Sequence, residues 1–185
     1  RDPYWGFTYW EITQKLLNYF FINPDEERYV NDLARKLNVD PKNLSNKLKE
    51  LEAEGLFCSE NKGQEKYYRL NTKFPLFNEY KSIVLKTVGM EFILKEALGK
   101  IKGVKEAYLF GSYAKNKMDS GSDIDLLVIG SQSALEVQKI TLGITNDIGR
   151  EVNVVDMDQA EFEERKKKDD FFIKEIFSGP TIKLV

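Results

Sequence analysis

Residues 108–130, which read YLFGSYAKNKMDSGSDIDLLVIG, constrain the fold of this chain more than any other stretch. Two apolar runs flank a polar segment that begins at Gly111 and Ser112 and ends at Asp123 and Asp125. Side chains two positions apart on a strand point to the same face, so the two carboxylates would lie side by side and repel each other. A purely structural strand has little use for such a pair. The pattern therefore indicates a ligand site between two apolar strands.

The residue types at this site suit phosphates and a metal ion. Gly111 lets the backbone turn sharply and approach a ligand closely, and Ser112 offers a hydroxyl and an N–H where a short helix starts. Asp123 and Asp125 can share Mg²⁺, a hard cation that prefers oxygen ligands. Each pair alone would suit a plain turn or a solvent-facing strand edge. Their combination favours phosphoryl or nucleotidyl transfer.

The composition limits the chemistry further. The chain has no histidine and one cysteine, Cys58, which excludes His-based triads, His–Cys zinc sites and an intramolecular disulfide. Catalysis must then use carboxylates, hydroxyls, lysines or a metal held by oxygens. No apolar run is long enough to span a bilayer and no leader peptide pattern opens the sequence, so we expect a cytoplasmic protein with no membrane partner. The net charge of −2 means that any basic face must be local.

The first part of the chain shows helical spacing followed by β-rich runs. Apolar periodicity and breaker residues predict three helices, then a hairpin with two arms, at residues 8–22, 29–39, 41–55, 56–59 and 66–70. Over residues 10–70 this order resembles the winged helix-turn-helix domains of small prokaryotic transcriptional regulators. The aromatic-rich start, residues 3–10, is either a dimer or domain interface or part of the core.

The rest of the chain changes from helical spacing to alternation. A long amphipathic helix is predicted over about residues 77–100, and it either packs the two halves together or pairs with a second copy of the chain. From residue 104 onward strands alternate with helices. This alternation argues for an α/β or α+β domain with a small mixed sheet.

Over about residues 90–185 the chain resembles the minimal nucleotidyltransferase branch of the polymerase-β-like superfamily. The family signature joins Gly-Ser to Asp-x-Asp within hydrophobic strands, and the matching residues are Gly111, Ser112, Ala114, Ser122, Asp123, Asp125 and Leu126. The resemblance implies a nucleoside triphosphate, with ATP the first choice, and Mg²⁺. It makes Asp123 and Asp125 the catalytic metal ligands. It assigns nucleotide contacts to Gly111, Ser112, Lys115 and Ser122.

Two positions depart from the family pattern. Asn116 stands where a glycine is usual, which would reshape the phosphate loop. Active members carry a third acid on a later strand, and the best register places Asn153 there. Glu151 lies two residues earlier on the same face and could serve as the third catalytic carboxylate, whereas Asp156 falls on the opposite face. The replacement shifts the expectation from efficient turnover towards nucleotide binding or slow transfer.

The third predicted helix begins with basic and polar residues and ends with acidic ones. A recognition helix inserts its N-terminal part into the major groove, where lysines meet phosphates and Asn or Ser reach base edges. We expect DNA contacts from this helix and from the hairpin, by residues Lys42, Asn43, Ser45, Asn46, Lys47, Lys49, Lys62 and Lys66. The alternatives are that the lysines only solvate the helix or that the domain binds a protein.

These expectations combine into a three-part chain. It comprises a winged helix-turn-helix domain, a linking helix and a nucleotidyltransferase-like domain, at residues 1–74, 75–103 and 104–185. The leading hypothesis is a DNA-binding transcriptional regulator whose second domain binds Mg-nucleoside triphosphate. The alternative is an active nucleotidyltransferase that, like related antitoxins, adenylylates a partner toxin or another acceptor. The third hypothesis is a protein-interaction module. Expected partners are DNA, a nucleotide, a toxin protein and a second copy of the chain.

Overall fold

The computed structural model describes residues 5–119 and 121–185, with side chains from residue 10 onward. Its contacts divide into two compact units, one that runs to Met90 and one that starts at Glu91. The segment predicted as an aromatic interface, residues 3–10, lies largely outside the described side chains. The predicted domain limits stay a prediction. Among the described residues, no helix is long and apolar enough to cross a bilayer.

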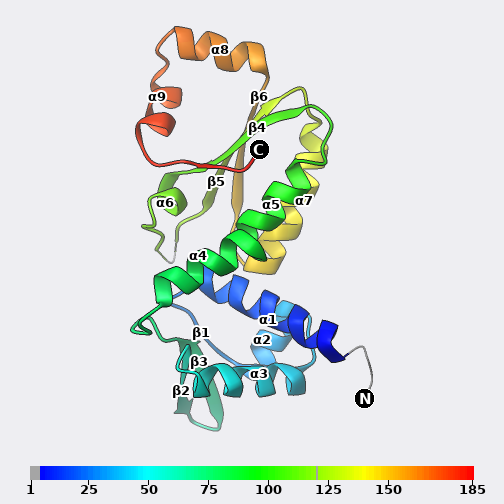
Figure 1. Cartoon of the computed structure of the whole chain (residues 1–185), viewed down its shortest axis with the longest axis vertical. Helices are drawn as coiled ribbons and strands as arrows, with labels where there is room; N and C mark the ends of the chain where they lie inside the picture. The colour runs from blue at the N-terminus through cyan, green and yellow to red at the C-terminus, as the bar shows by residue number, and fades with distance from the viewer. Residues whose placement is uncertain (1–4, 120) are drawn as a thin grey trace. The chain divides into compact units, whose positions relative to one another are not determined.

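In the first unit the helices and the hairpin follow one another in the predicted order (Figure 1). The elements are α1 (Trp5–Ile22), β1 (Glu27–Tyr29), α2 (Val30–Leu37), α3 (Pro41–Ala53), β2 (Phe57–Lys62), β3 (Glu65–Leu70) and α4 (Phe77–Thr87). The strands form an antiparallel sheet in the order β1-β3-β2, and the sequence pattern does not predict β1. The interpretation of this unit as a winged helix stays a prediction.

Local chemistry sets the start of α3, the predicted recognition helix. The carboxylate of Asp40 accepts a hydrogen bond from the backbone N–H of Asn43 at 2.8 Å, and Pro41 occupies the first helical position. Both features favour a helix start. Leu44 and Leu48 are fully buried on the face of α3 that contacts α1. The helix is therefore fixed at its first turn and along one side.

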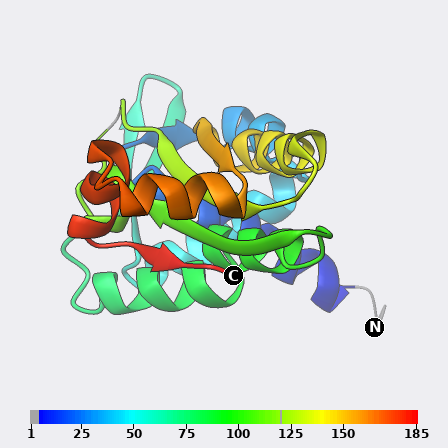
Figure 2. The ribbon, with the colours of Figure 1, turned by 90° about the horizontal axis from the view of Figure 1, so that it is seen from above.

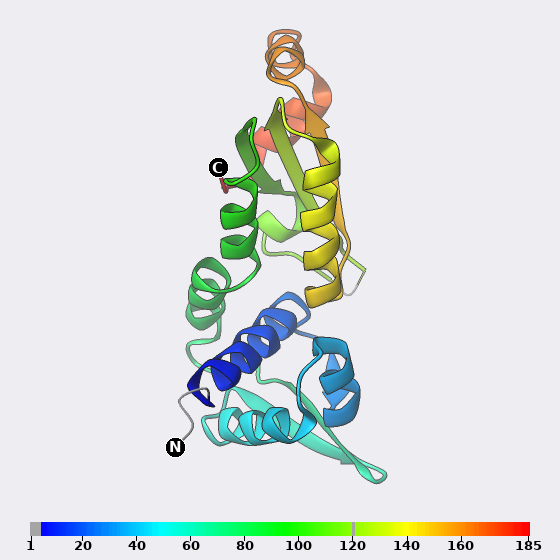
Figure 3. The same ribbon diagram turned by 90° about the vertical axis from the view of Figure 1, so that its right-hand side faces the viewer.

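The second unit contains a small mixed sheet, as predicted. Its elements are α5 (Met90–Leu98), β4 (Val104–Phe110), α6 (Gly111–Ala114), β5 (Ile124–Gly130), α7 (Ala134–Ile148), β6 (Val152–Met157), α8 (Gln159–Lys167), α9 (Phe171–Ser178) and β7 (Ile182–Lys183). The strand order is β6-β5-β4-β7, with β5 and β6 parallel and the other pairs antiparallel. Helices α5 and α7 lie on one face of this sheet (Figure 3), and α8 crosses near the other (Figure 2).

The prediction of one long linking helix over residues 77–100 is wrong, because α4 and α5 are separate helices. Gly89 lies between them, and a Cβ there would be 2.8 Å from Leu85 Cα and 3.0 Å from the Asn18 side-chain oxygen. That oxygen accepts a hydrogen bond from the backbone N–H of Met90 at 2.9 Å. A side chain of α1 therefore marks the break, and apolar spacing within the segment carries no sign of it.

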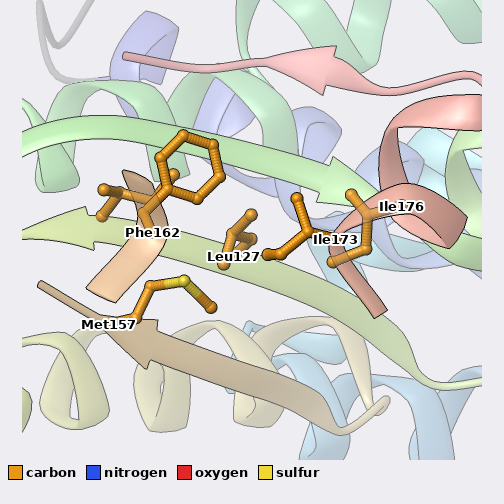
Figure 4. Close-up of a cluster of buried hydrophobic side chains, with 6 residues drawn as sticks. Leu127, Met157, Phe162, Ile173 and Ile176 are labelled. Atoms are coloured by element: carbon orange, nitrogen blue, oxygen red, sulfur yellow. The ribbon is translucent and has the colours of Figure 1, made fainter. Parts of the chain in front are cut away.

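The face of the sheet that meets α8 and α9 forms an apolar cluster (Figure 4). Its buried members come from two strands and two helices, and they are Leu127, Ile129, Met157, Phe162, Ile173 and Ile176. Alternation along β5 places Asp125 on the same face as Leu127, one pleat earlier. The apolar cluster thus ends where the paired carboxylates begin, and it fixes α9 beside them.

Candidate functional site

The turn between β4 and α6 brings a glycine against a carboxylate. Phe110, the last residue of β4, is paired with Asp125 across the sheet. Gly111 follows with a φ of +68°, and a Cβ built on it would lie 2.1 Å from Oδ2 of Asp125. A side chain at this position would therefore collide with the carboxylate. The glycine predicted to approach a ligand closely is required here by the neighbouring acid as well as by its backbone conformation.

The two aspartates and Asn153 lie together at the start of the parallel strand pair. Asp125 is in register with Asn153, and the Asn153 amide donates a hydrogen bond to Oδ2 of Asp123 at 3.2 Å. Burial and then the charge of Asp123 raise the pKa of Asp125, against the opposing effect of a hydrogen bond from Asn153. A divalent cation bound by both carboxylates would relieve the repulsion between them. The donor set therefore fits one Mg²⁺.

The third predicted acid is not joined to this pair. The register places Asn153 where the family pattern has its acid, as the sequence predicts. Glu151 precedes β6, is exposed, and lines a pocket bounded by α7 that Asn153 also lines. Among the residues described, no group of three or more His, Cys, Asp or Glu side chains is placed to hold a metal ion. The catalytic role of Glu151 stays a prediction, and Asp156 on the opposite face instead accepts a hydrogen bond from Gln132.

Arg150, for which the sequence predicts no role, stabilises the loop before Asp123 through hydrogen bonds. Arg150 is only 9% exposed, and its Nη1 donates to the backbone oxygens of Asp119 and Ser122 at 2.6 Å each. The Ser122 hydroxyl donates to the Asp119 carboxylate at 2.9 Å, and with the backbone N–H of Gly121 it lowers the pKa of that carboxyl. Ser122, predicted to contact the nucleotide, is thus already engaged in the loop itself.

Lys115 and Asp125 line one pocket with Gly111. This pocket has a volume of about 190 Å³, and its lining residues are Phe110, Gly111, Lys115, Asp125, Phe172, Glu175, Ile176, Gly179 and Pro180. Three predicted site residues therefore converge, and α9 supplies a wall that the sequence does not predict. Ser112 occupies the first turn of α6, where its backbone oxygen accepts from Lys117 N at 2.9 Å.

Two neighbouring residues keep α6 in place. Asn116 adopts a φ of +51°, a left-handed conformation that Asn accepts more readily than most residues. Tyr113 is buried, and its hydroxyl donates to Glu91 of α5 at 2.8 Å. Burial, followed by the charge of Glu91, raises the pKa of Tyr113 well above its usual range. That Asn116 reshapes the loop relative to the usual glycine stays a prediction.

The predicted DNA-contacting residues of the first unit have different environments. Lys42, Asn46 and Lys49 are exposed on α3, and Asn43 and Ser45 are partly exposed. Three other lysines are in ion pairs within the unit, which are Lys47 with Glu50 at 2.7 Å, Lys62 with Glu27 at 2.6 Å and Lys66 with Glu52 at 2.9 Å. Lys47 is also buried. The basic face is therefore narrower than the sequence predicts.

Residues 93–182 match the model of the nucleotidyltransferase domain family. The chain is 40% identical over 55 residues to the Methanocaldococcus jannaschii protein named "Putative protein adenylyltransferase MJ0435", an overlap of 29% of this chain and 59% of that protein. Among solved structures, the chain is similar to a mutant MntA-HpeT toxin–antitoxin, with 16% sequence identity and a TM-score of 0.38. The match covers 52% of this chain and 73% of that chain. It is also similar to a toxin–antitoxin with AMP-PNP, with 19% sequence identity and a TM-score of 0.33. This match covers 48% of this chain and 84% of that chain. The family match and the sequence relative support a nucleotidyltransferase domain in the second unit.

Proposed function

We propose that the second unit binds a nucleoside triphosphate with Mg²⁺ and transfers its nucleotidyl group to an acceptor hydroxyl. The observation that carries this proposal is the convergence of Gly111, Lys115 and Asp125 on one pocket, with Asp123 hydrogen-bonded to Asn153, the register partner of Asp125. Asp123 and Asp125 would hold the metal. Bound there, Mg²⁺ would neutralise charge that develops on the phosphates.

The protein groups have separate tasks in the transfer. The Lys115 ammonium and the backbone amides at the start of α6 bind the phosphates and keep the reacting phosphate in line with the acceptor. The acceptor oxygen forms a bond to the α-phosphorus, the bond from that phosphorus to the pyrophosphate oxygen breaks, and the acceptor proton passes to water. The amide of Asn153 cannot take up that proton, so transfer proceeds slowly.

The acceptor we favour is a protein. The Methanocaldococcus jannaschii relative is named a protein adenylyltransferase, and this name supports ATP as the donor and a protein side chain as the acceptor. The chain spans 59% of that relative, so the assignment to this chain is a proposal throughout. A toxin protein is the partner we would assay first.

Calorimetric titration of ATP with Mg²⁺ tests the proposal directly. We expect metal-dependent binding by the wild type and its loss in Asp125→Asn, because the neutral amide cannot hold the cation as the carboxylate does. Asp156→Asn is the matched control, since Asp156 lies on the opposite face of the sheet and bonds to Gln132. Equal binding by Asp125→Asn and wild type, or no binding of any triphosphate by the folded wild type, would contradict the proposal.

A second proposal concerns the first unit, which we infer to be a winged helix that binds DNA. The observation that favours it is the exposure of Lys42, Asn46 and Lys49 on α3. Binding of the full chain to a DNA duplex, measured by fluorescence anisotropy at several salt concentrations, tests it. Phosphate contacts make affinity fall steeply with salt, so absence of binding at the lowest salt would exclude DNA as the partner.

A further inference from the structure

The wall of the Asp125 pocket that faces the metal site comes from α9 and the turn after it. Phe172, Glu175 and Ile176 line it from the helix, followed by Gly179 and Pro180. Gly179 lies so close that a Cβ on it would be 3.5 Å from Cε of Lys115, so the lysine stem runs along this glycine. The C-terminal segment is therefore part of the site that grips the phosphates.

This wall is held firmly. The Asp170 carboxylate caps α9 by accepting hydrogen bonds from the backbone N–H groups of Phe172 and Ile173 at 3.1 and 3.2 Å. Ile173 belongs to the buried cluster under the helix. Beyond the turn, β7 pairs with β4, where Lys183 lies opposite Tyr108. Side chains on α9 thus have a fixed position relative to the end of β4 and to the pocket.

The pocket is the size of one part of a nucleotide. Its volume of about 190 Å³ equals that of roughly six water molecules at ~30 Å³ each, far less than a whole nucleoside triphosphate needs. Gly111, Lys115 and Asp125 occupy the phosphate side. The group bonded directly to the α-phosphate is the sugar. A pocket that continues from the phosphate site therefore meets the sugar first.

The chemistry of the α9 wall suits a ribose. The Glu175 carboxylate can only accept hydrogen bonds, and vicinal sugar hydroxyls supply two adjacent donors. Acidic side chains bind ribose hydroxyls in this way at other nucleotide sites. Phe172, Ile176 and Pro180 give an apolar surface for the C–H face of the ring. The positive charge of Lys115, which lines the same pocket, reduces the repulsion between the Glu175 carboxylate and the phosphates.

We infer that Glu175 accepts hydrogen bonds from the 2′- and 3′-hydroxyls of the bound nucleotide and selects ribonucleotides over deoxyribonucleotides. The inference rests on the proposed function, because it needs a triphosphate held at Gly111 and Lys115. It makes Glu175 a specificity-determining residue that does not join the metal ligands. A different role, as a substitute third acid, would affect every triphosphate alike.

The experiment compares ATP with 2′-deoxy-ATP, each with Mg²⁺, by calorimetric titration of wild type, Glu175→Ala and Glu164→Ala. 2′-Deoxy-ATP lacks only the 2′-hydroxyl, and the loss of that one charged hydrogen bond should change affinity about tenfold, so we expect this preference for ATP in the wild type. Glu175→Ala should abolish the preference, because it removes two hydrogen bonds from bound ATP and one from bound 2′-deoxy-ATP. Glu164 is an exposed acid on α8 paired with Lys168, and its variant should keep the full preference.

Two results would overturn the inference alone. One is equal affinity of the wild type for ATP and 2′-deoxy-ATP with Mg²⁺ dependence intact. The other is an equal loss for both nucleotides in Glu175→Ala, which would make Glu175 a general part of the site. Binding of neither nucleotide by the wild type would overturn the inference together with the proposed function. Glu175 is exposed, so circular dichroism should show Glu175→Ala as folded as the wild type.

Discussion

Two groups of charged residues in this protein, the lysines of the first unit and the aspartate pair of the second, have opposite surroundings. In the first unit, acids and bases neutralise each other, as in the pairs of Lys62 with Glu27 and Lys66 with Glu52. In the second unit, Asp123 just before β5 and Asp125 on β5 act on each other as like charges, and a polar side chain hydrogen-bonded to them is the neutral Asn153. Paired surface charges contribute little to stability or function, whereas unrelieved like charges need a ligand to explain them.

The comparison teaches how to weigh charges in a sequence. Counting lysines overestimates a basic surface, because partners far along the chain can neutralise them, as Glu27 does for Lys62. Two acids fixed by strand alternation on the same face cannot escape each other in this way. The carboxylate pair is therefore the stronger functional signal, and the predictions below are designed to break or sharpen this contrast.

The largest effect should come from core truncation, which tests whether the units are separate. Leu44 in the first unit and Leu127 in the second are both fully buried. Each change to Ala should lower the free energy of unfolding by about 2–5 kcal/mol, because it removes buried methyl groups and leaves a cavity. Calorimetry should show that each variant shifts the transition of its own unit. A single transition that responds equally to both variants would contradict two units.

The next prediction concerns the third acid. Asn153→Asp should raise the rate of adenylyl transfer by about 100-fold, because a carboxylate in register with Asp125 can act as a general base. Incorporation of labelled AMP into the acceptor measures the rate. Glu151→Gln serves for comparison and should leave the rate unchanged, since Glu151 precedes β6 whereas Asn153 is the register partner of Asp125. Loss of transfer in Glu151→Gln would instead establish Glu151 as the stand-in acid.

A smaller effect should separate free from paired lysines in the first unit. Lys42→Ala should reduce the slope of log affinity for DNA against log salt by about 0.9, the value for one phosphate contact. Lys66→Ala should leave the slope unchanged, because Lys66 is already paired with Glu52 at 2.9 Å. Anisotropy titrations across a salt series provide both slopes. Equal slopes for Lys42→Ala and wild type would remove α3 from the DNA interface.

The smallest predicted effect concerns the pH dependence of stability, to which Glu26 and Asp125 should contribute with opposite signs. Burial raises the pKa of Glu26, but hydrogen bonds from Arg28 and Tyr19 outweigh it and lower that pKa overall, so this acid stabilises the first unit above its unfolded pKa. That stability is lost as pH falls through the lowered value. The raised pKa of Asp125 acts in reverse, because its charged form opposes folding and protonation relieves that cost. Each contribution should be about 1 kcal/mol or less.

Melting temperatures measured at decreasing pH, with no metal present, test whether Glu26 and Asp125 contribute to stability with opposite signs. Glu26→Gln should remove the acid sensitivity that Glu26 confers on the first unit. Asp125→Asn should make the metal-free second unit slightly more stable at neutral pH, where the wild-type carboxylate is charged. A lower melting temperature for Asp125→Asn under those conditions would mean that the carboxylate has a stabilising partner, and the metal assignment would lose its basis.

The sequence predicts the features that depend on local spacing. Strand alternation and the Gly-Ser to Asp-x-Asp signature were enough to predict two adjacent strands, the face shared by Asp123 and Asp125, and the register of Asn153. The features it does not predict depend on contacts between distant segments. The break at Gly89 involves a side chain of α1, and the α9 wall brings Glu175 to the pocket of Asp125. No periodicity within one segment reports such contacts.

Gly111 has a consequence for how variants and relatives of this protein should be compared. Any side chain there would meet the Asp125 carboxylate at once, so the two positions are epistatic. Gly111→Ala would displace Asp125, a proposed metal ligand, in addition to any effect on a phosphate contact. An alanine scan would therefore record the loss of the Asp125 carboxylate twice, once at position 111 and once at position 125. A larger residue at position 111 becomes acceptable only after position 125 has shortened. Sequences that change both together have therefore abandoned the metal site, whatever the rest of their motif retains.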